Sequence, residues 1–581
     1  VYSTRGRHSL KLGALIHKTR NFVLVTTNRS GQWSFASLPA FLEGRAQTFT
    51  VITPGSRNDR TYDFSILGFY LQDDVQVRRD FTLNLGLRYE FHTEYEEIRG
   101  LGYAVRDIRS DADATPGAPF ENPSLRNFSP RFGFAWDVRG NGKTALRGGV
   151  GLLYDLASIG SSFIVGATST PPISTTTRLT APAFRPLPPI PSGRGSRTLR
   201  TIDYHLQQPH LLSYNLTLER ELPFGMGATV VYAGSRGINL IQSKDGNPTV
   251  PLGVVRGGIC DSRVPTPPAS NTGPKCWRGA GATDANPVGS ATAIDPRINP
   301  NWADVEFKTA GSSSWYNSMQ LVLSKRLSQG LQFQSSYTWG KLIDETQGQF
   351  QGPEALGALG DDPSNRRHDR GRAEFDIRHQ WRWNALYRFP SRLTGGWGKL
   401  ANGWWSGAIL SWNSGIPFAP QLGTQRSRSA VLGANGGDRR PNLAAGVERE
   451  DITRGESRGC DGVAPGTKLG TPERFYDPCA FAIQPLGFLG NASRGLISGP
   501  NFSTLDLSLA KDTPLPYLGE RGSLQFRAEF FNILNHPSFG LPERAVYTGR
   551  NDVEPARSTA GQITSTFSQS RELQFALKII F

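Results

Sequence analysis

Long apolar runs, cysteine and methionine are scarce in this sequence. Its 581 residues include four Cys and two Met, and no stretch offers the roughly 18–20 apolar residues that a membrane-spanning helix needs. Segments rich in helix-forming residues are also few. These shortages exclude a protein of transmembrane helices and argue against a helical bundle. Intrinsic disorder is disfavoured because 10% of the residues are aromatic.

Positive charge exceeds negative charge along the chain. Lys and Arg total 64 against 49 Asp and Glu, which gives a formal net charge of +15. The charge is dispersed, without a Lys/Arg-rich block, an RNP motif or zinc-finger spacing. Nucleic acid is therefore not expected as a partner despite the basic composition. What remains is a basic surface, either without a special role or facing anionic lipid headgroups and acidic ligands.

The cysteines form two near pairs in the sequence, Cys260 with Cys276 and Cys460 with Cys479. Both pairs fall in long segments rich in Pro and Gly. Four cysteines allow three connectivities, and the local pairing is the simplest. Two loop disulfides would imply an oxidising compartment. Zinc is the competing interpretation, but no Cys-x-x-Cys spacing or neighbouring His cluster supports it.

A regular alternation of apolar and polar residues is the dominant pattern, and it is typical of strands. Residues 81–91 (FTLNLGLRYEF) place Phe, Leu and Tyr on one face and Thr, Asn, Arg and Glu on the other. The alternation recurs at 212–218, 331–339, 381–389 and 524–530. The sequence therefore predicts an all-β protein.

About fifteen strands are predicted, and many are long. Strands of soluble proteins usually have about 5–6 residues, whereas a tilted membrane crossing needs about 9–11. The expected strands are 8–27, 31–37, 66–78, 81–92, 128–138, 143–154, 211–221, 225–235, 315–327, 330–341, 376–389, 403–415, 503–511, 522–533 and 571–581. Most of them are long enough to cross a membrane.

The connections between these strands alternate in length from residue 78 onward. The short ones are 78–80, 139–142, 222–224, 328–329, 390–402 and 512–521. The long ones are about 93–127, 155–210, 236–314, 342–375, 416–502 and 534–570. Short periplasmic turns and long extracellular loops are the pattern of an outer-membrane β-barrel. A soluble β-sandwich also alternates apolar and polar residues, but it gives no reason for loop length to alternate.

The last strand places Leu573, Phe575, Leu577, Ile579 and Phe581 on one apolar face. It resembles the terminal-strand signal by which the barrel-assembly machinery recognises outer-membrane proteins. If this strand runs from the outside to the periplasm, all six long loops lie outside. An open sheet edge cannot lie in lipid. The first expected strand, 8–27, would also run from the outside to the periplasm. We therefore expect a fragment whose true N-terminus is missing, together with an odd number of strands.

Several short motifs resemble one receptor family. Residues 530–539 (FFNILNHPSF) look like EFFNLFNHPNF, a hallmark of Oar-like TonB-dependent receptors of Acidobacteria-type genomes. Further motifs are similar to GKHSLKFG, GFYVQDDW…LTLNLGLRYE and DRG…FDxRH of that family: GRHSLKLG at 6–13, GFYLQDD at 68–74 with LNLGLRYE at 83–90, and DRG at 369–371 with FDIRH at 375–379. LNLGLRYE is common to many receptors, whereas the FFN…NHPxF block is fairly specific.

The resemblance implies an antiparallel transmembrane β-barrel of about 22 strands, plugged by an N-terminal domain. The whole chain, 1–581, would be a partial barrel domain without the plug, the TonB box and about seven strands. In that family the ligand binds the extracellular loops and the plug. TonB, driven by the proton gradient of the inner membrane, then pulls on the plug to open a path.

No catalytic constellation emerges from the sequence. Asp376, Arg378 and His379 are close together but fit a polar cap where a strand begins. No HExxH, EF-hand, Walker A or dinucleotide motif is present. We therefore predict no enzyme activity, no metal and no cofactor.

Polar residues of the strands are expected to line the barrel lumen, where they contact plug and water or, alternatively, ligand. They are Arg88, Glu90, Arg147, Glu219, Arg382, Arg527 and Glu529. Trp302, Trp315 and Tyr316 lie near a border between loop and strand. They are expected in an interfacial aromatic belt, with stacking on sugars as the alternative.

These features and the resemblance predict an integral outer-membrane receptor of a Gram-negative bacterium that imports a bulky ligand, and the resemblance implies that TonB supplies the energy. The expected partners are TonB, the barrel-assembly machinery, and outer-membrane lipid with lipopolysaccharide. No motif identifies the ligand; an oligosaccharide is the first expectation and a siderophore the second. The alternative is a passive pore or an adhesin-like surface barrel without energy coupling. The presence of a plug would distinguish a receptor from a passive pore, because passive porins lack a plug and have about 16–18 strands.

Overall fold

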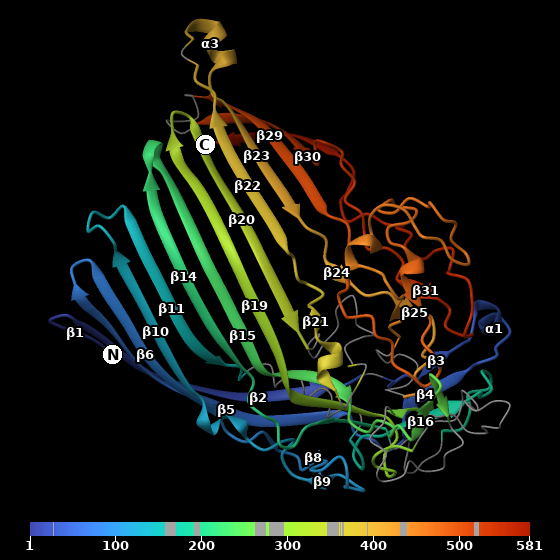
Figure 1. The fold of residues 1–581 in the computed structure, drawn as a ribbon. Coiled ribbons are helices and arrows are strands. Elements are labelled where there is room, and N and C mark those ends of the chain that lie inside the picture. Colours follow the sequence, from blue (N-terminus) through green and yellow to red (C-terminus); the bar gives the residue numbers. More distant parts are fainter. Residues whose placement is uncertain are drawn as a thin grey trace.

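One large antiparallel sheet, here called the wall, runs through the whole chain (Figure 1). The computed structural model describes residues 1–26, 28–156, 170–190, 198–261, 275–277, 296–345, 360, 362, 365–391, 393–429, 439–515 and 522–581. Parts of the predicted loops 155–210, 236–314, 342–375 and 416–502 therefore lie outside the described residues. The sheet holds 18 strands, three of which (β7, β13 and β21) are short additions near the long connections.

Each wall strand pairs with the next wall strand along the chain in antiparallel register. The wall strands are β1 (Tyr2–Arg5), β2 (His8–Leu24), β5 (Asp59–Arg78), β6 (Phe81–His92), β10 (Phe128–Asp137), β11 (Thr144–Tyr154), β14 (His210–Leu222), β15 (Met226–Asp245), β19 (Val305–Ser328), β20 (Leu331–Asp344), β22 (His379–Arg388), β23 (Trp404–Asn413), β29 (Phe502–Pro514), β30 (Ser523–Phe531) and β32 (Glu572–Ile580). Among the described residues the sheet is open, with β1 and β32 at its edges.

Apolar side chains of the wall are exposed on one of its faces. Leu85 and Leu87 of β6 are 44% and 49% exposed, and the polar Asn84 and Arg88 alternate with them in sequence. Leu573, Phe575, Leu577, Ile579 and Phe581, the expected apolar face of the last strand, are all more than half exposed. An apolar surface of this extent is the lipid-facing band of a membrane barrel.

Two expectations about the first strands are wrong. Residues 31–37 do not cross with the wall; only β3 (Gln32–Ser34) forms there, in a separate sheet with β4 (Thr48–Ile52). The ladder passes directly from β2 to β5, where Leu24 pairs with Asp59. Strand β1, which forms a hairpin with β2, takes the place of the expected strand 31–37 in the count of wall strands. Strand β2 therefore runs in the direction opposite to that expected, and residues 25–58 form a seventh long connection.

Strands β15 and β19 continue well beyond the expected 225–235 and 315–327. Their ladder passes two bulges, between Gly237 and Leu240 and between Leu240 and Gln242, and then goes on to Asp245. Asn239 and Gly311 have positive φ there, of 54° and 113°. A Cβ on Gly311 would lie 2.1 Å from a guanidinium nitrogen of Arg366. The sequences of these extensions do not alternate between apolar and polar residues, because their side chains are buried among loops.

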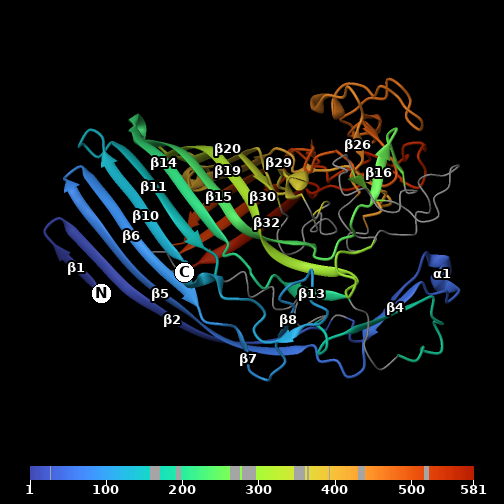
Figure 2. The same cartoon turned by 60° about the horizontal axis from the view of Figure 1, so that its bottom comes forward.

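The seven long connections fold together with these strand extensions at one end of the wall, and we call this body the loop assembly (Figure 2). Its strands are β3, β4, β7 (Glu96–Glu97), β8 (Tyr103–Ala104), β9 (Thr115–Pro116), β12 (Thr176–Thr180), β13 (Leu199–Ile202), β16 (Gly253–Arg256), β17 (Ile259–Asp261), β18 (Lys275–Cys276), β21 (Gly371–Arg372), β24 (Pro417–Phe418), β25 (Gln421–Leu422), β26 (Asn442–Leu443), β27 (Phe481–Ala482), β28 (Ile497–Ser498) and β31 (Ala545–Tyr547).

Helices are short. Helix α1 (Leu38–Leu42) and four 3-10 turns, η1 (Pro123–Arg126), η4 (Arg366–Asp369), η6 (Arg449–Ile452) and η7 (Pro478–Ala480), belong to the loop assembly. At the opposite end of the wall lie η2 (Pro223–Gly225) and α3 (Gly395–Ala401), which projects from the turn between β22 and β23 (Figure 1). None of the helices in the described part of the chain is long and apolar enough to cross a membrane.

The buried hydrophobic clusters lie in the loop assembly rather than in the middle of the wall. The largest contains Phe418, Leu422, Ile452, Tyr476, Phe481 and Val546, all at most 2% exposed. A second surrounds Val23, Tyr62, Tyr95 and Ile202, and a third surrounds Val105, Leu199, Trp302, Val305 and Phe307. The long connections are therefore a packed body and not a set of separate loops.

Candidate ligand-binding site

A cavity of about 460 Å³ opens in the loop assembly, beside the third hydrophobic cluster. It is lined by polar and charged residues from the segment 106–109, from the end of β13 and from the end of β15, and by an apolar part. The lining residues are Arg106, Asp107, Ile108, Arg109, Asp203, His205, Lys244, Asp245, Gly246, Pro248, Ile298 and Phe307. The volume falls within the range of ligand pockets, about 300–1,000 Å³.

The segment that carries Arg106 and Arg109 is held by hydrogen bonds to its backbone. Asp111 accepts from the N–H groups of Arg106 and Asp107, both at 3.0 Å. Buried Asn299 donates to the carbonyl of Ile108 at 3.1 Å and to that of Asp111 at 2.9 Å. The indole of Trp302 also donates to the Asp111 carbonyl, at 2.8 Å. The two arginines are therefore presented from a fixed backbone.

Protein donors already occupy the carboxylates of the cavity. Asp107 accepts from the N–H of Arg109 at 2.9 Å and from Ser110 Oγ at 2.7 Å, and these bonds hold the pKa of Asp107 below its usual range. Asp203 accepts from Thr309 Oγ1 at 2.6 Å. Asp245 accepts from the N–H of Asn247 at 2.9 Å and pairs with Arg297 at 3.5 Å.

The cationic groups of the cavity have fewer protein partners than its carboxylates. Within the described residues no hydrogen bond or ion pair reaches the ammonium of Lys244 or the guanidinium of Arg109. The Lys244 Nζ lies 5.8 Å from the ring centre of Phe307. Burial lowers the pKa of Lys244; the carboxylate of Asp203 opposes this shift, and the guanidinium groups of Arg366 and Arg109 add to it. The cavity thus offers hydrogen-bond donors with positive charge.

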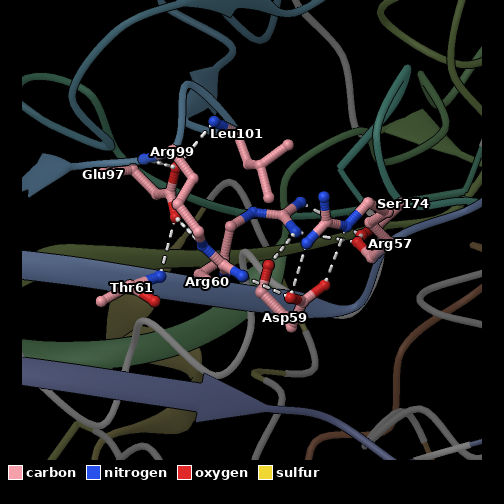
Figure 3. Close-up of polar contacts among 8 residues, drawn as sticks. All are labelled: Arg57, Asp59, Arg60, Thr61, Glu97, Arg99, Leu101 and Ser174. Carbon is pink, nitrogen blue, oxygen red and sulfur yellow. Dashed lines mark hydrogen bonds and ion pairs between the residues drawn. The ribbon is translucent and has the colours of Figure 1, made fainter.

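A network of charged residues joins the loop-end of β5 to three connections, as Figure 3 shows. Asp59 accepts from Arg57 at 2.8 Å and from Arg99 at 2.5 Å. These two guanidinium groups, Arg57 first, hold the pKa of Asp59 well below its usual range. Glu97 accepts from the N–H groups of Thr61 and Leu101, both at 2.7 Å. We call this set the β5 clasp.

Arg60 is the buried member of the β5 clasp and is only 2% exposed. Its guanidinium donates to the carbonyls of Arg57 and Asp59, at 2.8 and 2.9 Å, and to Ser174 Oγ at 3.1 Å. Ser174 in turn donates to the Arg57 carbonyl at 2.5 Å. Burial lowers the pKa of Arg60. The connections 25–58 and 155–209 are thereby fixed to the wall extension at one point.

Ion pairs also fasten the connection 414–501 to the connection 345–378. Arg494 pairs with Asp344 of β20, and their side chains are 8% and 6% exposed. Arg440 pairs with Asp369 at 2.9 Å. Beside them, burial first and then Arg440 lower the pKa of His368 to about 4. These contacts tie the connection 414–501 to the end of β20 and to the segment around Asp369.

Asp376 and His379, which the sequence placed in a polar cap, contact neighbouring backbone and side chains. Asp376 accepts from the N–H of Leu342 at 2.7 Å and from Arg372 Nε at 2.8 Å. His379 Nδ1 lies 2.7 Å from the hydroxyl of Tyr337. In the described part of the chain no group of three His, Cys, Asp or Glu residues could hold a metal ion.

The predicted lumen residues lie in five different strands and do not converge on one site. Arg88 pairs with Glu90, and Arg147 pairs with Glu219 at 3.4 Å. Arg527 donates to Gln525 at 2.6 Å and lies over the ring of Trp405. Arg382 belongs to β22. Glu529 lines a separate cavity of about 550 Å³ between β20, β22, β23, β29 and β30.

The four cysteines form two disulfides in the loop assembly, Cys260 with Cys276 and Cys460 with Cys479. Each bond closes a local loop, with sequence separations of 16 and 19 residues. The first bond links β17 and β18, which pair with the two edges of β16, and the second borders the largest hydrophobic cluster. They are the two local pairs that the spacing favoured.

Trp302 is not part of an interfacial belt. It is 2% exposed and packs in the third hydrophobic cluster. Trp315, by contrast, lies on β19, where the guanidinium groups of Arg370 and Arg236 stand 4.1 and 5.5 Å from its ring centre. Tyr316 follows it on the same strand.

The cavity residues were not identified from the sequence. Arg106 and Arg109 lie in one connection, Asp203 lies in another and Lys244 is near the end of β15, without a motif or a periodic spacing. The available signal was weak: the long connections carry several charged residues among Pro and Gly. Only the folding of the connections against one another brings these side chains together.

Comparison with known proteins gives one family over almost the whole chain. The family described as "Outer membrane beta barrel domain" matches residues 1–574. No curated protein matches the chain.

Among solved structures, the outer membrane transporter YddB from Escherichia coli is 11% identical with a TM-score of 0.47, over 100% of this chain and 52% of that chain. The siderophore receptor PiuA from Acinetobacter baumannii is 9% identical with a TM-score of 0.42, over 99% and 54%. The ferric-catecholate import receptor Fiu from Escherichia coli is 9% identical with a TM-score of 0.40, over 100% and 53%. The chain spans about half the length of these structures.

Proposed function

The chain belongs to the outer membrane beta-barrel domain family, and from this premise we propose that it is the barrel portion of a receptor that imports a bulky ligand using TonB-supplied energy. The chain is located in the outer membrane as a strand-built barrel domain. The loop assembly would then lie outside the cell, and the short turns with α3 would face the periplasm.

The packed loop assembly is the observation that carries this proposal. A passive pore needs loops that leave its opening free, whereas capture of a ligand needs ordered side chains outside the membrane. Here seven connections share three hydrophobic clusters, two disulfides and several buried ion pairs. Such a body supports a receptor that binds before it transports.

The proposed ligand is an oligosaccharide, with a siderophore as the second choice. The proposed partners are TonB, acting through a plug, the barrel-assembly machinery, which would recognise the exposed apolar face of β32, and outer-membrane lipid with lipopolysaccharide. The support for the assembly signal is the exposed fraction of Leu573, Phe575, Leu577, Ile579 and Phe581, from 53% to 90%.

Uptake by whole cells tests the proposal. The full-length protein would be produced in the outer membrane of a Gram-negative host, and fluorescent oligosaccharides of several compositions would be offered. We expect at least one oligosaccharide to bind the cell surface even when a protonophore is present. Its uptake should be lost under the same condition. The same uptake should be lost in cells without TonB.

Two outcomes would contradict the proposal. Uptake that continues without a proton gradient, together with steady conductance of the purified protein in planar bilayers, would identify a passive pore. Binding without uptake in energised cells would identify an adhesin-like surface barrel.

A further inference from the structure

We propose that the cavity lined by Lys244, Arg106 and Arg109 binds the acidic group of the ligand, and that the ligand is therefore an acidic oligosaccharide. This inference rests on the proposed function, because it names the class of ligand that the receptor would bind. The acidic group would be a carboxylate, phosphate or sulfate carried by a sugar ring.

The first support for this proposal comes from the cationic hydrogen-bond donors of the cavity. The three carboxylates of the cavity accept from protein donors, whereas no ion pair within the described residues reaches Lys244 or Arg109. An anion could therefore reach these donors without displacing an existing salt bridge. Hydrogen bonds from charged donors to oxyanions are among the stronger ones in proteins.

The second support for this proposal is that the backbone carrying the cationic groups of the cavity is held in place. The backbone around Arg106 and Arg109 is held by Asp111, Asn299 and Trp302 before any ligand arrives. Lys244 is held by the ladder between β15 and β19, in which it pairs with Phe307. A binding site of this kind loses little conformational entropy when the ligand binds.

The composition of the remaining lining points to a sugar rather than to a small inorganic anion. Ile108, Pro248, Ile298 and Phe307 form an apolar part next to the cationic groups. A sugar ring has apolar C–H faces, and an acidic sugar carries a carboxylate on the rim of such a ring. The cavity of about 460 Å³ leaves room for more than a single oxyanion.

Binding to the purified full-length protein in detergent, free of lipopolysaccharide, is the test. The probes are fluorescent hexagalacturonate as the acidic sugar, maltohexaose as a neutral sugar of equal length, and inorganic phosphate as a competitor. We expect hexagalacturonate to bind and maltohexaose to bind at least about tenfold more weakly. A charged hydrogen bond contributes about 1.5–3 kcal/mol, so Lys244→Gln and Arg109→Gln should each weaken binding about 10- to 100-fold.

Two controls keep the experiment decisive. Lys468→Gln removes the same charge from an exposed position of the loop assembly outside the cavity and should change affinity less than about twofold. Lys244→Arg keeps the charge and should restore most of the binding. Heat modifiability on gels would confirm that every variant retains its barrel.

Several results would overturn the inference. They are equal binding of both sugars, equal effects of Lys244→Gln and Lys468→Gln, and no binding of hexagalacturonate. Binding of inorganic phosphate, measured directly, without binding of either sugar would reassign the cavity to a small oxyanion. Binding to lipopolysaccharide alone, in a parallel arm with added lipopolysaccharide, would reassign it to a lipid headgroup. None of these results affects the uptake experiment, so failure here is distinguishable from failure of the transport proposal.

Discussion

The wall and the loop assembly place their apolar side chains in opposite ways. In β32 of the wall, Phe575 and Leu577 are 65% and 71% exposed. In the loop assembly, Phe418 and Tyr476 are 1% and 0% exposed. Both regions belong to one chain and both consist mainly of strands and their connections.

The difference comes from the solvent that each region meets. In water an apolar side chain is stabilised by burial, at about 25 cal/mol for each Å², so the connections pack around hydrophobic clusters. In hydrocarbon the apolar side chain is already well solvated, and it is the backbone that must be satisfied internally. The wall does this with continuous ladders, for example from His8 to Leu24 against β5. The comparison teaches that the boundary between the two patterns marks the edge of the membrane.

Charged pairs differ in the same way between the two regions. Lys11 and Asp74 on the wall are 42% and 20% exposed in their side chains, whereas Arg494 and Asp344 in the loop assembly are 8% and 6% exposed. Removal of one partner of a buried pair strongly destabilises the fold, whereas an exposed pair contributes little to stability. The loop assembly should therefore be the more sensitive region to loss of a single charge.

Arg494→Ala should have the largest effect, because it leaves the Asp344 carboxylate buried without its partner. Such a loss costs about 3–5 kcal/mol. We expect the loop assembly to become sensitive to protease and to unfold at lower urea concentration, while the wall keeps its heat-modifiable behaviour on gels. Arg458→Ala is the matched control, since Arg458 and Asp451 are 57% and 60% exposed. Equal effects of the two variants would contradict the comparison.

Leu218→Arg should have the next largest effect, and in the wall instead of the loop assembly. Leu218 is 43% exposed on the apolar face of β14, and an arginine on the lipid face of a barrel costs up to about 2–4 kcal/mol, depending on its depth in the bilayer. Thr217→Arg puts the same charge on the polar face of the same strand. Folding into liposomes should be impaired for Leu218→Arg alone. If Thr217→Arg is equally damaging, the assignment of the faces is wrong.

Acid should loosen the loop assembly before it affects the wall. His368 has its pKa lowered to about 4 in the folded protein, against about 6.5 for an unperturbed histidine. The unfolded segment thus takes up a proton first as the pH falls, and the contribution of neutral His368 to stability is lost between about pH 6.5 and 4. Amide hydrogen exchange, corrected for intrinsic rates, should show faster exchange in residues 365–378 at pH 4.5. In His368→Gln this pH dependence should be reduced; if it stays unchanged, another group is responsible.

Asp59→Asn should have the smallest effect, because the ion pairs of the β5 clasp are partly exposed. Exposed pairs contribute about 0.2–1 kcal/mol each, and Asp59 has two, with Arg57 and Arg99. We expect modestly faster amide exchange at residues 96–101 and no change in wall strands. Glu43→Gln, which breaks the exposed pair with Arg45, should leave amide exchange at residues 96–101 unchanged. An effect of Asp59→Asn on the wall would show that the two regions are coupled there.

The wall was predictable from the sequence where the alternation is regular. The expected 81–92 agrees with β6, and the expected 128–138 and 143–154 differ from β10 and β11 by a residue at most at each end. In these segments the period of two reflects lipid on one side and a polar interior on the other. The expectation for 31–37 failed because a short alternating stretch also suits the small sheet of β3 and β4.

The strand extensions and the cavity were not predictable, and the reason is physical. Beyond Gly237, β15 is enclosed by loops on its sides, so its residues NLIQSKD (239–245) show no alternation although the ladder continues. Trp302 was expected in a belt because tryptophan is common at membrane surfaces, but the packing of the loops buries it. Lys244 and Arg109 are far apart in sequence and meet only when three connections fold together.

The sequence by itself determined the solvent of each strand face, the alternation of turns and long connections, and the local spacing of the cysteines, because each of these follows from the order of residues along the chain. The tertiary structure alone decided which strand is first in the sheet, how far β15 and β19 continue, and which charged groups meet in the cavity and in the β5 clasp. These features depend on contacts between distant connections, and a pattern of period two carries no information about such contacts.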